Sequence, residues 1–423
     1  RDIGGAGARQ HRLRPLASPA LANRRNYKTD TARCNNRSCG LDEHFNGIDN
    51  AKDYSILAVG GSNVKAAVFR EVLAPQTIEE IELDKPQGRE VLVRNVAAGI
   101  CHSDLLFFEG SWAHPRPTIL GHEVAGVVVA TGPDVTSMKP GDHIVGCAGG
   151  PCYECRYCVM GRPIICINRN HDRRASETPR IMSKGEKIHQ YGQLSGFAEG
   201  MLIHEHACVV IPKEIPLKLA AIIGCGVATG LGAVFNTAKV EPGASVVVTG
   251  VGGVGLNAVQ GARISGASKI IAVDISDDNL ALAKKLGATH LVNASLTDSV
   301  EFVRDVTTGG ADYVIETSGS AKVAESAFDL LGEGAVLTLV GLPAHGTKIS
   351  FDMTRLIPSE MSVRGCHVGS LRPRIDLPRY CEMYLNGALD LETLVTQTYS
   401  LAEINEGFGR LTAGTKGRGV VIF

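Results

Sequence analysis

The sequence has almost no net charge and no long hydrophobic run. Its 43 basic and 44 acidic residues nearly cancel, which argues against binding of nucleic acid through a basic face. The longest uncharged stretch, residues 243–262, is interrupted by glycine, threonine, asparagine and glutamine, so we do not expect it to span a membrane. We find no secretory signal, internal repeat or low-complexity segment. We therefore expect neither nucleic acid nor a membrane among its partners.

Residues 1–62 differ from the rest of the chain. The first thirty are rich in arginine and almost free of acidic residues, with proline, alanine and serine between. This composition is typical of a mitochondrial targeting segment, and equally of a disordered or appended tail. We therefore expect a cytoplasmic protein, or a mitochondrial one if residues 1–30 are a targeting segment. Cys34 and Cys39 lie in this part, and we assign them no role.

The pattern of predicted secondary structure changes once in the rest of the chain, near residue 226. From residue 63 to 226, runs such as 64–69, 91–96 and 127–130 predict short strands separated by glycine and proline turns, and the polar stretch 168–195 predicts a long loop. From 227 to 366, buried strands near 244–249, 269–274, 311–316 and 335–340 alternate with helical spacing at 256–264 and 279–286. This alternation predicts an α/β fold with a doubly wound, Rossmann-type parallel sheet beside a mainly β domain. Residues 367–423 are expected to return to the first domain, with a final strand at 420–423.

A glycine-rich turn follows the first strand of the predicted parallel sheet. It reads Gly250-Val-Gly-Gly-Val-Gly255 and is followed by a predicted helix. Gly250 permits a tight turn, Gly252 lets the backbone approach a pyrophosphate, and Gly255 lets the helix pack on the strand. The helix N-terminus, preceded by Gly253 and Val254, offers free N–H donors to phosphates. In this context the pattern predicts a dinucleotide site rather than a simple glycine turn.

An acidic residue selects the dinucleotide. Asp274 ends the next predicted strand, nineteen residues after Gly255. A carboxylate there binds the ribose hydroxyls of NAD and repels the additional phosphate of NADP. Because Ile275 follows, with no arginine directly beside it, we favour NAD.

Four of the twelve cysteines fall within one short loop. Cys152, Cys155 and Cys158 are each separated by two residues, and Cys166 follows after seven. Short intervals of this kind suit four thiolates around one Zn²⁺ and strain disulfides. A closed set of four ligands leaves no open position, so this zinc would be structural. An iron–sulfur cluster is the main alternative, with disulfides or free thiols a weaker one.

A second donor set is dispersed along the chain. Cys101, His122 and Cys225 lie in the segments Gly-Ile-Cys-His-Ser-Asp, Gly-His-Glu-Val-Ala-Gly and Ile-Gly-Cys-Gly-Val-Ala-Thr. Taken singly, each residue has an ordinary interpretation as a core or surface residue. Together, two thiolates and one imidazole leave a fourth position on a zinc ion for water or substrate.

From about residue 63 to 423 the sequence resembles the zinc-dependent medium-chain alcohol dehydrogenase family. The four-cysteine loop, the Gly-Cys-Gly segment and the dinucleotide glycines occur in the family's order. The family's zinc signature is matched by Gly121, His122, Glu123, Gly126, Gly132 and Val135. The resemblance implies a GroES-like catalytic domain that carries the zinc loop, two zinc ions per chain, NAD, and a homodimer or homotetramer that uses the region near 335–340.

The resemblance also implies a role for each site residue. Cys101, His122 and Cys225 would hold the catalytic zinc, with Asp104 and Glu123 beside them, and Ser103 would accept the proton of the alcohol. The residues implied to contact the cofactor are His102 and Arg418 at the pyrophosphate and Thr229, Val340 and Leu342 at the nicotinamide. The expected reaction is the reversible oxidation of a primary or secondary alcohol to an aldehyde or ketone, with hydride transfer to NAD.

Two positions depart from the family's pattern. Leu106 stands where many relatives have a histidine that passes the proton to solvent, so the proton is expected to leave by another path. Ala148 occupies a position where relatives often have a large aromatic residue, and Trp112 lies on a loop that forms another wall. If Ala148 is not merely a turn residue, the pocket has room for an aromatic or longer alcohol.

Three alternatives remain open. A glutathione-type formaldehyde dehydrogenase of the same family often has an arginine at the position of Asn170, next to Arg169 here. A non-enzymatic zinc protein with a structural or redox-sensing role is a more distant possibility. His204 and His206 are expected to be surface residues, because the nearby sequence offers no third ligand.

Overall fold

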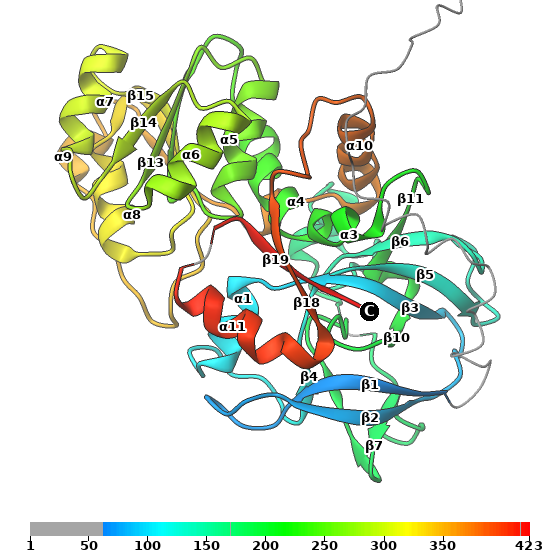
Figure 1. The fold of residues 1–423 in the computed structure, drawn as a ribbon. Coiled ribbons are helices and arrows are strands. Elements are labelled where there is room, and N and C mark those ends of the chain that lie inside the picture. The colour runs from blue at the N-terminus through cyan, green and yellow to red at the C-terminus, as the bar shows by residue number, and fades with distance from the viewer. Residues whose placement is uncertain (1–61, 170, 415) are drawn as a thin grey trace, which may run out of the picture. The chain divides into compact units, whose positions relative to one another are not determined.

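The computed structural model describes residues 62–169, 171–414 and 416–423. The predictions for residues 1–61, including those for Cys34 and Cys39, and for Asn170 lie outside this part. Within it the strands form three sheets (Figure 1).

The first sheet has the order β8-β7-β2-β1-β4-β9. Its strands are β1 (Ser62–Phe69), β2 (Thr77–Leu83), β4 (Thr118–Ile119), β7 (Ile181–Ser183), β8 (Glu186–Lys187) and β9 (His189–Gln190). The prediction of one continuous loop over 168–195 is therefore wrong. Leu83 of β2 pairs with Ile181 of β7, and Ile181 and Ile188 are buried. Two isolated apolar residues in a polar stretch were too weak a pattern to indicate strands this short.

The second sheet has the order β11-β6-β5-β3-β19-β18, with β10 also paired to β3. Its strands are β3 (Glu90–Gly99), β5 (Glu123–Thr131), β6 (His143–Gly146), β10 (Gly200–His204), β11 (Cys208–Ile211), β18 (Val395–Ser400) and β19 (Arg418–Ile422). As predicted, the C-terminal strand returns to the first part of the chain, because Val421 of β19 pairs with Ala98 of β3. One hydrophobic core joins the two sheets, with Val68 of β1, Val93 of β3 and Val124 of β5 among its buried residues.

The third sheet is parallel throughout and has the order β14-β13-β12-β15-β16-β17. Its strands are β12 (Ser245–Thr249), β13 (Lys269–Asp274), β14 (His290–Asn293), β15 (Ala311–Glu316), β16 (Leu331–Leu339) and β17 (Ser362–Gly365). Four helices connect them, α5 (Gly255–Ile264), α6 (Asp277–Leu286), α7 (Ser299–Thr307) and α8 (Ala321–Phe328). Alternate residues of β12 point to opposite faces, so Val246 joins the core of α5 and α6 while Val247 joins that of α7 and α8.

Shorter elements complete the described chain. The other helices are α1 (His102–Phe108), α2 (Arg156–Val159), α3 (Leu217–Ala220), α4 (Gly226–Gly232), α9 (Met353–Leu356), α10 (Pro373–Leu385) and α11 (Ile404–Thr412). The helical turns are η2 (Pro163–Ile165), η3 (Glu205–Ala207), η4 (Ala221–Gly224), η5 (Ala233–Ala238), η6 (Val368–Ser370) and η7 (Leu401–Glu403). Among the described residues no single helix is long and apolar enough to cross a membrane, although the bent pair 217–224 and 226–238 passes that test by length and composition.

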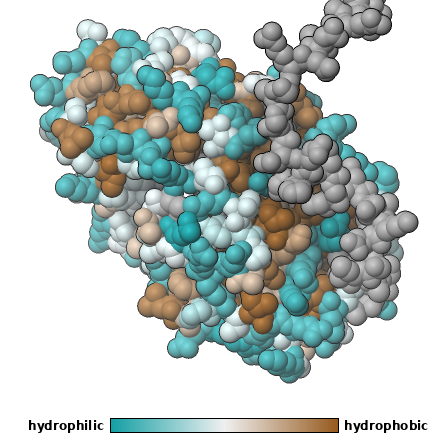
Figure 2. All heavy atoms as spheres, in the orientation of Figure 1, coloured by the Kyte–Doolittle hydropathy of each residue, from teal (hydrophilic) through white to brown (hydrophobic). Residues whose placement is uncertain are grey.

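The predicted fold class is confirmed, since a parallel sheet with helices on both faces accompanies two sheets of largely antiparallel strands. The third sheet uses residues 245–365, and the other two use residues up to 211 and from 395 onward. The domain limits at 63, 227 and 367 stay predictions. On the face drawn in Figure 2, hydrophobic and hydrophilic side chains are interspersed.

Candidate metal and dinucleotide sites

The sheet register brings two of the dispersed donors together. β3 and β5 are antiparallel neighbours, with Gly99 paired to Glu123. Cys101, just after β3, and His122, just before β5, therefore lie at the same end of the strand pair. Cys225 joins them from the junction of η4 and α4, where its Sγ lies 3.3 Å from His122 Nε2. The ligand atoms of these three residues and Glu123 all lie within 4.8 Å of one another.

Asp104 sets the orientation of His122. The Oδ1 atom of Asp104 accepts a hydrogen bond from His122 Nδ1 at 3.1 Å and another from the backbone N–H of Gly121 at 3.0 Å. Both side chains are buried. With its proton held at Nδ1, the imidazole presents the lone pair of Nε2 toward the two cysteines, which is the usual arrangement of a metal-ligating histidine.

A buried ion pair adjoins this group. Arg418 Nη2, at the start of β19, lies 3.2 Å from Glu123 Oε1, which also accepts from the backbone N–H of Gly226 at 3.1 Å. Burial raises the pKa of Glu123 to about 7. A hydrogen bond from Cys225, together with the positive charges of Arg418 and His122, holds the pKa of the Cys101 thiol well below its ordinary value.

The donors fit a zinc ion that keeps an open position. Two thiols and one imidazole converge in a buried site, and one thiol is already biased toward the thiolate. Glu123 Oε2 and Asp104 Oδ2 have no hydrogen-bond partner although both are buried, which indicates a site built around a charge. The individual roles of Cys101, His122 and Cys225 stay predictions. Ser103 lies close by, with its Oγ 3.8 Å from Cys101 Sγ.

The four clustered cysteines surround one point. Their Sγ atoms are separated by 3.4 Å for 152–166, 3.6 Å for 155–158, 3.8 Å for 155–166 and 3.9 Å for 152–158. A tetrahedral Zn²⁺ with Zn–S bonds of about 2.3 Å requires Sγ separations of about 3.8 Å. None of these four cysteines is in a disulfide, and a cluster of several irons would hold the thiolates farther apart. Backbone N–H groups of Cys155 and Glu154 donate to Cys152 Sγ at 3.3 and 3.4 Å, so the fit is to one structural zinc ion.

The glycine loop lies between β12 and α5, as predicted. Gly250 has φ +80°, and a Cβ on Gly255 would lie 2.1 Å from the carbonyl oxygen of Gly250, so neither position tolerates a side chain without rearrangement. A Cβ on Gly252 would meet no atom within 4 Å, which leaves this backbone open to a phosphate. Asp274 ends β13, and its Oδ2 accepts from the backbone N–H of Val251 at 2.7 Å.

Arg418 links the loop to the metal donors. Its Nε would lie 2.4 Å from a Cβ on Gly253, and its Nη2 would lie 2.5 Å from one on Gly226. The other residues predicted to contact the cofactor lie on different elements. Thr229 in α4 and Val340 after β16 are buried, whereas His102 and Leu342 are exposed.

An aromatic cluster adjoins the metal donors. The Tyr191 ring lies 5.2 Å from the His122 ring and 4.5 Å from Phe107, which also contacts Trp112 and His114 at 6.3 and 5.8 Å between ring centroids. The sequence prediction included Trp112 but not the other three aromatic residues. Tyr191 is remote in sequence from Phe107 and His114, and no local pattern indicates that their rings meet.

Two small residues, Ala148 and Gly192, pack against each other next to Tyr191. Gly149 donates its backbone N–H to Gly192 O at 2.9 Å, which places Ala148 against Gly192. A Cβ on Gly192 would lie 3.0 Å from Ala148 Cβ and 3.9 Å from His122 Cβ. Ala148 lies in the turn after β6 and packs against Gly192, which follows Tyr191; its place in a substrate pocket stays a prediction.

The prediction that His204 and His206 are surface residues is wrong for His206. His206 is 7% exposed, and both histidines lie against His171 from the loop before β7. A third candidate ligand therefore exists in space. The sequence does not indicate this third ligand, because His171 is remote along the chain from His204 and His206.

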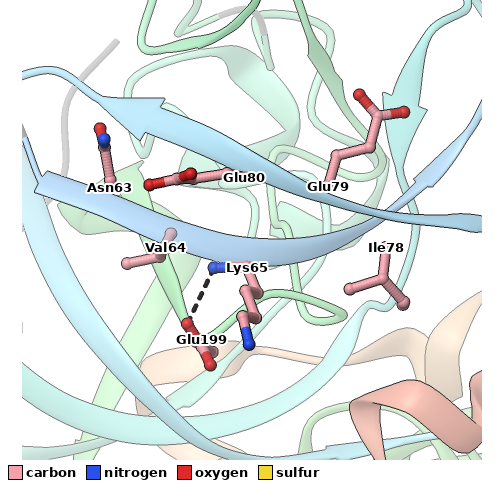
Figure 3. Close-up of a pocket in the computed structure, with 7 residues that line it drawn as sticks. All are labelled: Asn63, Val64, Lys65, Ile78, Glu79, Glu80 and Glu199. Carbon is pink, nitrogen blue, oxygen red and sulfur yellow. Dashed lines mark hydrogen bonds between the residues drawn. The ribbon is translucent and has the colours of Figure 1, made fainter.

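The surface hollow drawn in Figure 3 is distinct from these sites. Within it Lys65 donates its backbone N–H to Glu199 Oε2 at 2.8 Å. Its lining residues are Asn63, Val64, Lys65, Ile78, Glu79, Glu80 and Glu199. It contains none of the metal or cofactor residues predicted from the sequence, and so it does not compete with them as a candidate active site.

Comparison with known proteins identifies similarities over most of the chain. Residues 87–213 match the family model "alcohol dehydrogenase GroES-like domain", and residues 253–385 match "zinc-binding dehydrogenase". Alcohol dehydrogenase 1 of Pisum sativum is 36% identical over 366 residues, which cover 84% of this chain and 96% of that protein. The S-(hydroxymethyl)glutathione dehydrogenase of Paracoccus denitrificans is 37% identical over 375 residues, 85% of this chain and 99% of that protein. Among solved structures, benzyl alcohol dehydrogenase from Acinetobacter calcoaceticus has a TM-score of 0.81 at 34% identity and covers 86% of this chain and 99% of its own.

Proposed function

The chain belongs to the zinc-dependent medium-chain alcohol dehydrogenase family and is an NAD-dependent zinc oxidoreductase, and on that premise we propose that its substrates are bulky aromatic alcohols. The observation that carries this proposal is the pairing of two small residues, Ala148 and Gly192, with an aromatic wall beside His122. A flat substrate ring can stack against Tyr191 and Phe107 where a large residue at position 148 would fill the space. The similarity to a benzyl alcohol dehydrogenase supports the same substrate class.

Each residue of the site has a separate role in the proposed reaction. Zinc supplies a Lewis acid that lowers the pKa of the alcohol, and NAD accepts the hydride. Asp104 fixes the tautomer of His122, and buried Arg418 balances the charge of Glu123. We propose that Ser103, whose Oγ lies 3.8 Å from Cys101 Sγ, takes the hydroxyl proton.

The onward path of the proton is also part of the proposal. Leu106 is buried and carries no acid or base. We propose that the proton reaches solvent without a histidine at this position. We expect slower deprotonation than in relatives that have this histidine.

A thiol-adduct formaldehyde dehydrogenase is the second candidate. The 37% identity to S-(hydroxymethyl)glutathione dehydrogenase favours it. Against it, Arg169 is engaged with the zinc loop, where its Nε donates to the carbonyl oxygen of Cys166 at 2.9 Å. A cation held in this way is less free to bind the carboxylates of a glutathione adduct.

A substrate panel with NAD tests both candidates. We expect kcat/KM for benzyl alcohol and cinnamyl alcohol to exceed that for ethanol by at least about 100-fold, or about 2.7 kcal/mol. Higher activity with S-hydroxymethylglutathione would favour the second candidate and refute the first. Cys225→Ser should abolish turnover with every substrate while NADH still quenches protein fluorescence.

We also propose that the chain forms a homodimer or homotetramer through the third sheet. The region expected at the contact, near 335–340, lies mainly in the inner strand β16, so the exposed edge is its neighbour β17. β17 is the outer strand there, and Met353 and Ile357, which precede it, are exposed. An edge strand with free backbone groups and nearby apolar side chains favours pairing with a second copy. Sedimentation velocity would show a monomer if this assembly were wrong.

A further inference from the structure

Three histidines outside the dehydrogenase site converge beneath the four-cysteine loop. His171 comes from the segment before β7, His204 ends β10 and His206 lies in η3. Their candidate ligand atoms lie within 4.8 Å of one another, and the rings of His171 and His204 are stacked at 4.1 Å. We propose that these histidines form a third metal site, which binds one divalent transition-metal ion of the class that prefers imidazole, such as Zn²⁺, Co²⁺ or Ni²⁺.

His171 is oriented as a ligand. Its Nε2 donates a hydrogen bond to the carbonyl oxygen of Gly150 at 2.7 Å. The proton of the neutral ring is thereby held at Nε2, and the lone pair of Nδ1 is available. A hydrogen bond from the second ring nitrogen to a backbone carbonyl is the usual support of a metal-ligating histidine.

His206 has a ring nitrogen without a hydrogen-bond partner in this histidine cluster. Its side chain is 7% exposed, and its Nδ1 is buried without a hydrogen-bond partner. An unpaired buried polar atom is destabilising, and coordination of an ion would give this atom a partner. The proton of this ring would then move to Nε2.

Hydrogen bonds that two of the histidines already make would have to break when a metal ion binds, and this lowers the affinity of the site. Arg89 Nη2 lies 3.1 Å from His206 Nε2, and a guanidinium can only donate. His204 Nδ1 accepts from the backbone N–H of His206 at 3.1 Å. Arg89 is 44% exposed and keeps Glu205 as a partner at 2.5 Å, so it can turn away from His206 at small cost. A metal ion at this site therefore competes with Arg89 for His206 and with the backbone N–H of His206 for the lone pair of His204.

The charge state of the ring nitrogens favours a metal over protons. Burial, aided by neighbouring histidines and arginines, lowers the pKa of His204 to about 3 and that of His206 to about 4. Arg89, Arg180 and Arg374 are the nearby cations that weaken binding, and the carboxylate of Glu205 opposes them. This balance disfavours hard cations, which gain little from imidazole.

Cobalt binding to the enzyme loaded with two zinc ions per chain tests the proposal. We expect calorimetry to show one further Co²⁺ per chain, with visible d–d bands and no thiolate-to-cobalt charge-transfer band. His171→Gln and His204→Gln should each weaken this binding by at least the roughly 10- to 100-fold loss seen when a group that orients a ligand is removed. Arg89→Gln, which can still bond Glu205, should tighten it. The matched control His290→Gln, on β14, should change nothing.

Alcohol oxidation should be unchanged in all four variants, because none alters a residue of the dehydrogenase site. That readout shows that the variants are folded. Cobalt that binds only with a thiolate charge-transfer band has entered a cysteine site, and this result contradicts the proposal. Equal cobalt affinity in wild type and both histidine variants overturns it as well.

Discussion

Replacing Ala148 by phenylalanine should convert the proposed aromatic pocket into a narrow one. Ala148 Cβ lies 3.0 Å from the position of a Cβ on Gly192, and that position is 3.9 Å from His122 Cβ. A phenyl group at position 148 therefore enters the space beside Gly192, where we place the substrate ring. Excluding that ring from about 150 Å² of apolar contact costs up to about 4 kcal/mol at about 25 cal/mol per Å². Allowing for partial adjustment, we expect kcat/KM for benzyl alcohol to fall by about 100-fold, or about 2.7 kcal/mol.

The assay compares benzyl alcohol with ethanol, measured as initial rates of NADH formation. Ethanol is too small to need this space, so its kcat/KM should change by less than about threefold, or about 0.7 kcal/mol. Ala175→Phe, at an exposed position in the loop before β7, is the matched control and should affect neither substrate. An equal loss for both substrates would show that Ala148 does not separate large from small alcohols, and the pocket assignment would be wrong.

Three other perturbations have defined outcomes. Cys152→Ser opens the four-thiolate set, so zinc content should fall from two ions to one per chain and the thermal midpoint should drop; retention of both ions would contradict a structural zinc. Asp274→Ser removes the carboxylate that accepts from Val251 and should raise kcat/KM with NADP relative to NAD by at least about tenfold, an effect absent if Asp274 is not the selector. Glu79 accepts two hydrogen bonds from Arg70, which lower its pKa to about 2. Because this folded-state pKa is depressed, the stabilisation is complete above about pH 4.5 and is lost as the pH falls toward 2. Since Arg70 is 37% exposed, we expect Glu79→Gln to lower the free energy of unfolding by about 1–2 kcal/mol at pH 7 rather than the full value of the shift. Urea unfolding of both proteins should show this difference shrinking below pH 4.5, and a difference independent of pH would refute the assignment.

The parallel sheet was predictable because each of its elements has a local signature. The strands β13 and β15 have the limits predicted, 269–274 and 311–316, because each is a short run of apolar residues between breaks. Ser276 and Gly287 mark the two ends of α6 by a side-chain cap and a left-handed turn. The strands β7 and β9 were not predictable, since they pair with β2 and β4, which are remote in sequence, and β8 pairs in turn with β7.

The donor sets of the two zinc sites were predictable for a similar reason. The cysteines of the structural site are local, and those of the catalytic site lie in segments with their own glycine patterns. The aromatic wall and the histidine cluster have no such pattern. Tyr191 and His171 contact rings from segments that are remote in sequence, Phe107 and His122 for Tyr191 and His204 and His206 for His171.

The fold places Arg418 between two sites that the sequence identifies separately, the metal donors and the dinucleotide loop. It starts β19, which pairs with β3, the strand that leads directly to Cys101. From there its guanidinium lies against Glu123 of the metal site and against Gly253 of the dinucleotide loop. A buried arginine with one carboxylate partner must keep that partner, because the lone charge would be costly to bury. If the phosphates of the cofactor bind at the glycine loop as predicted, they would compete with Glu123 for this guanidinium, and cofactor affinity would then depend on the charge of Glu123.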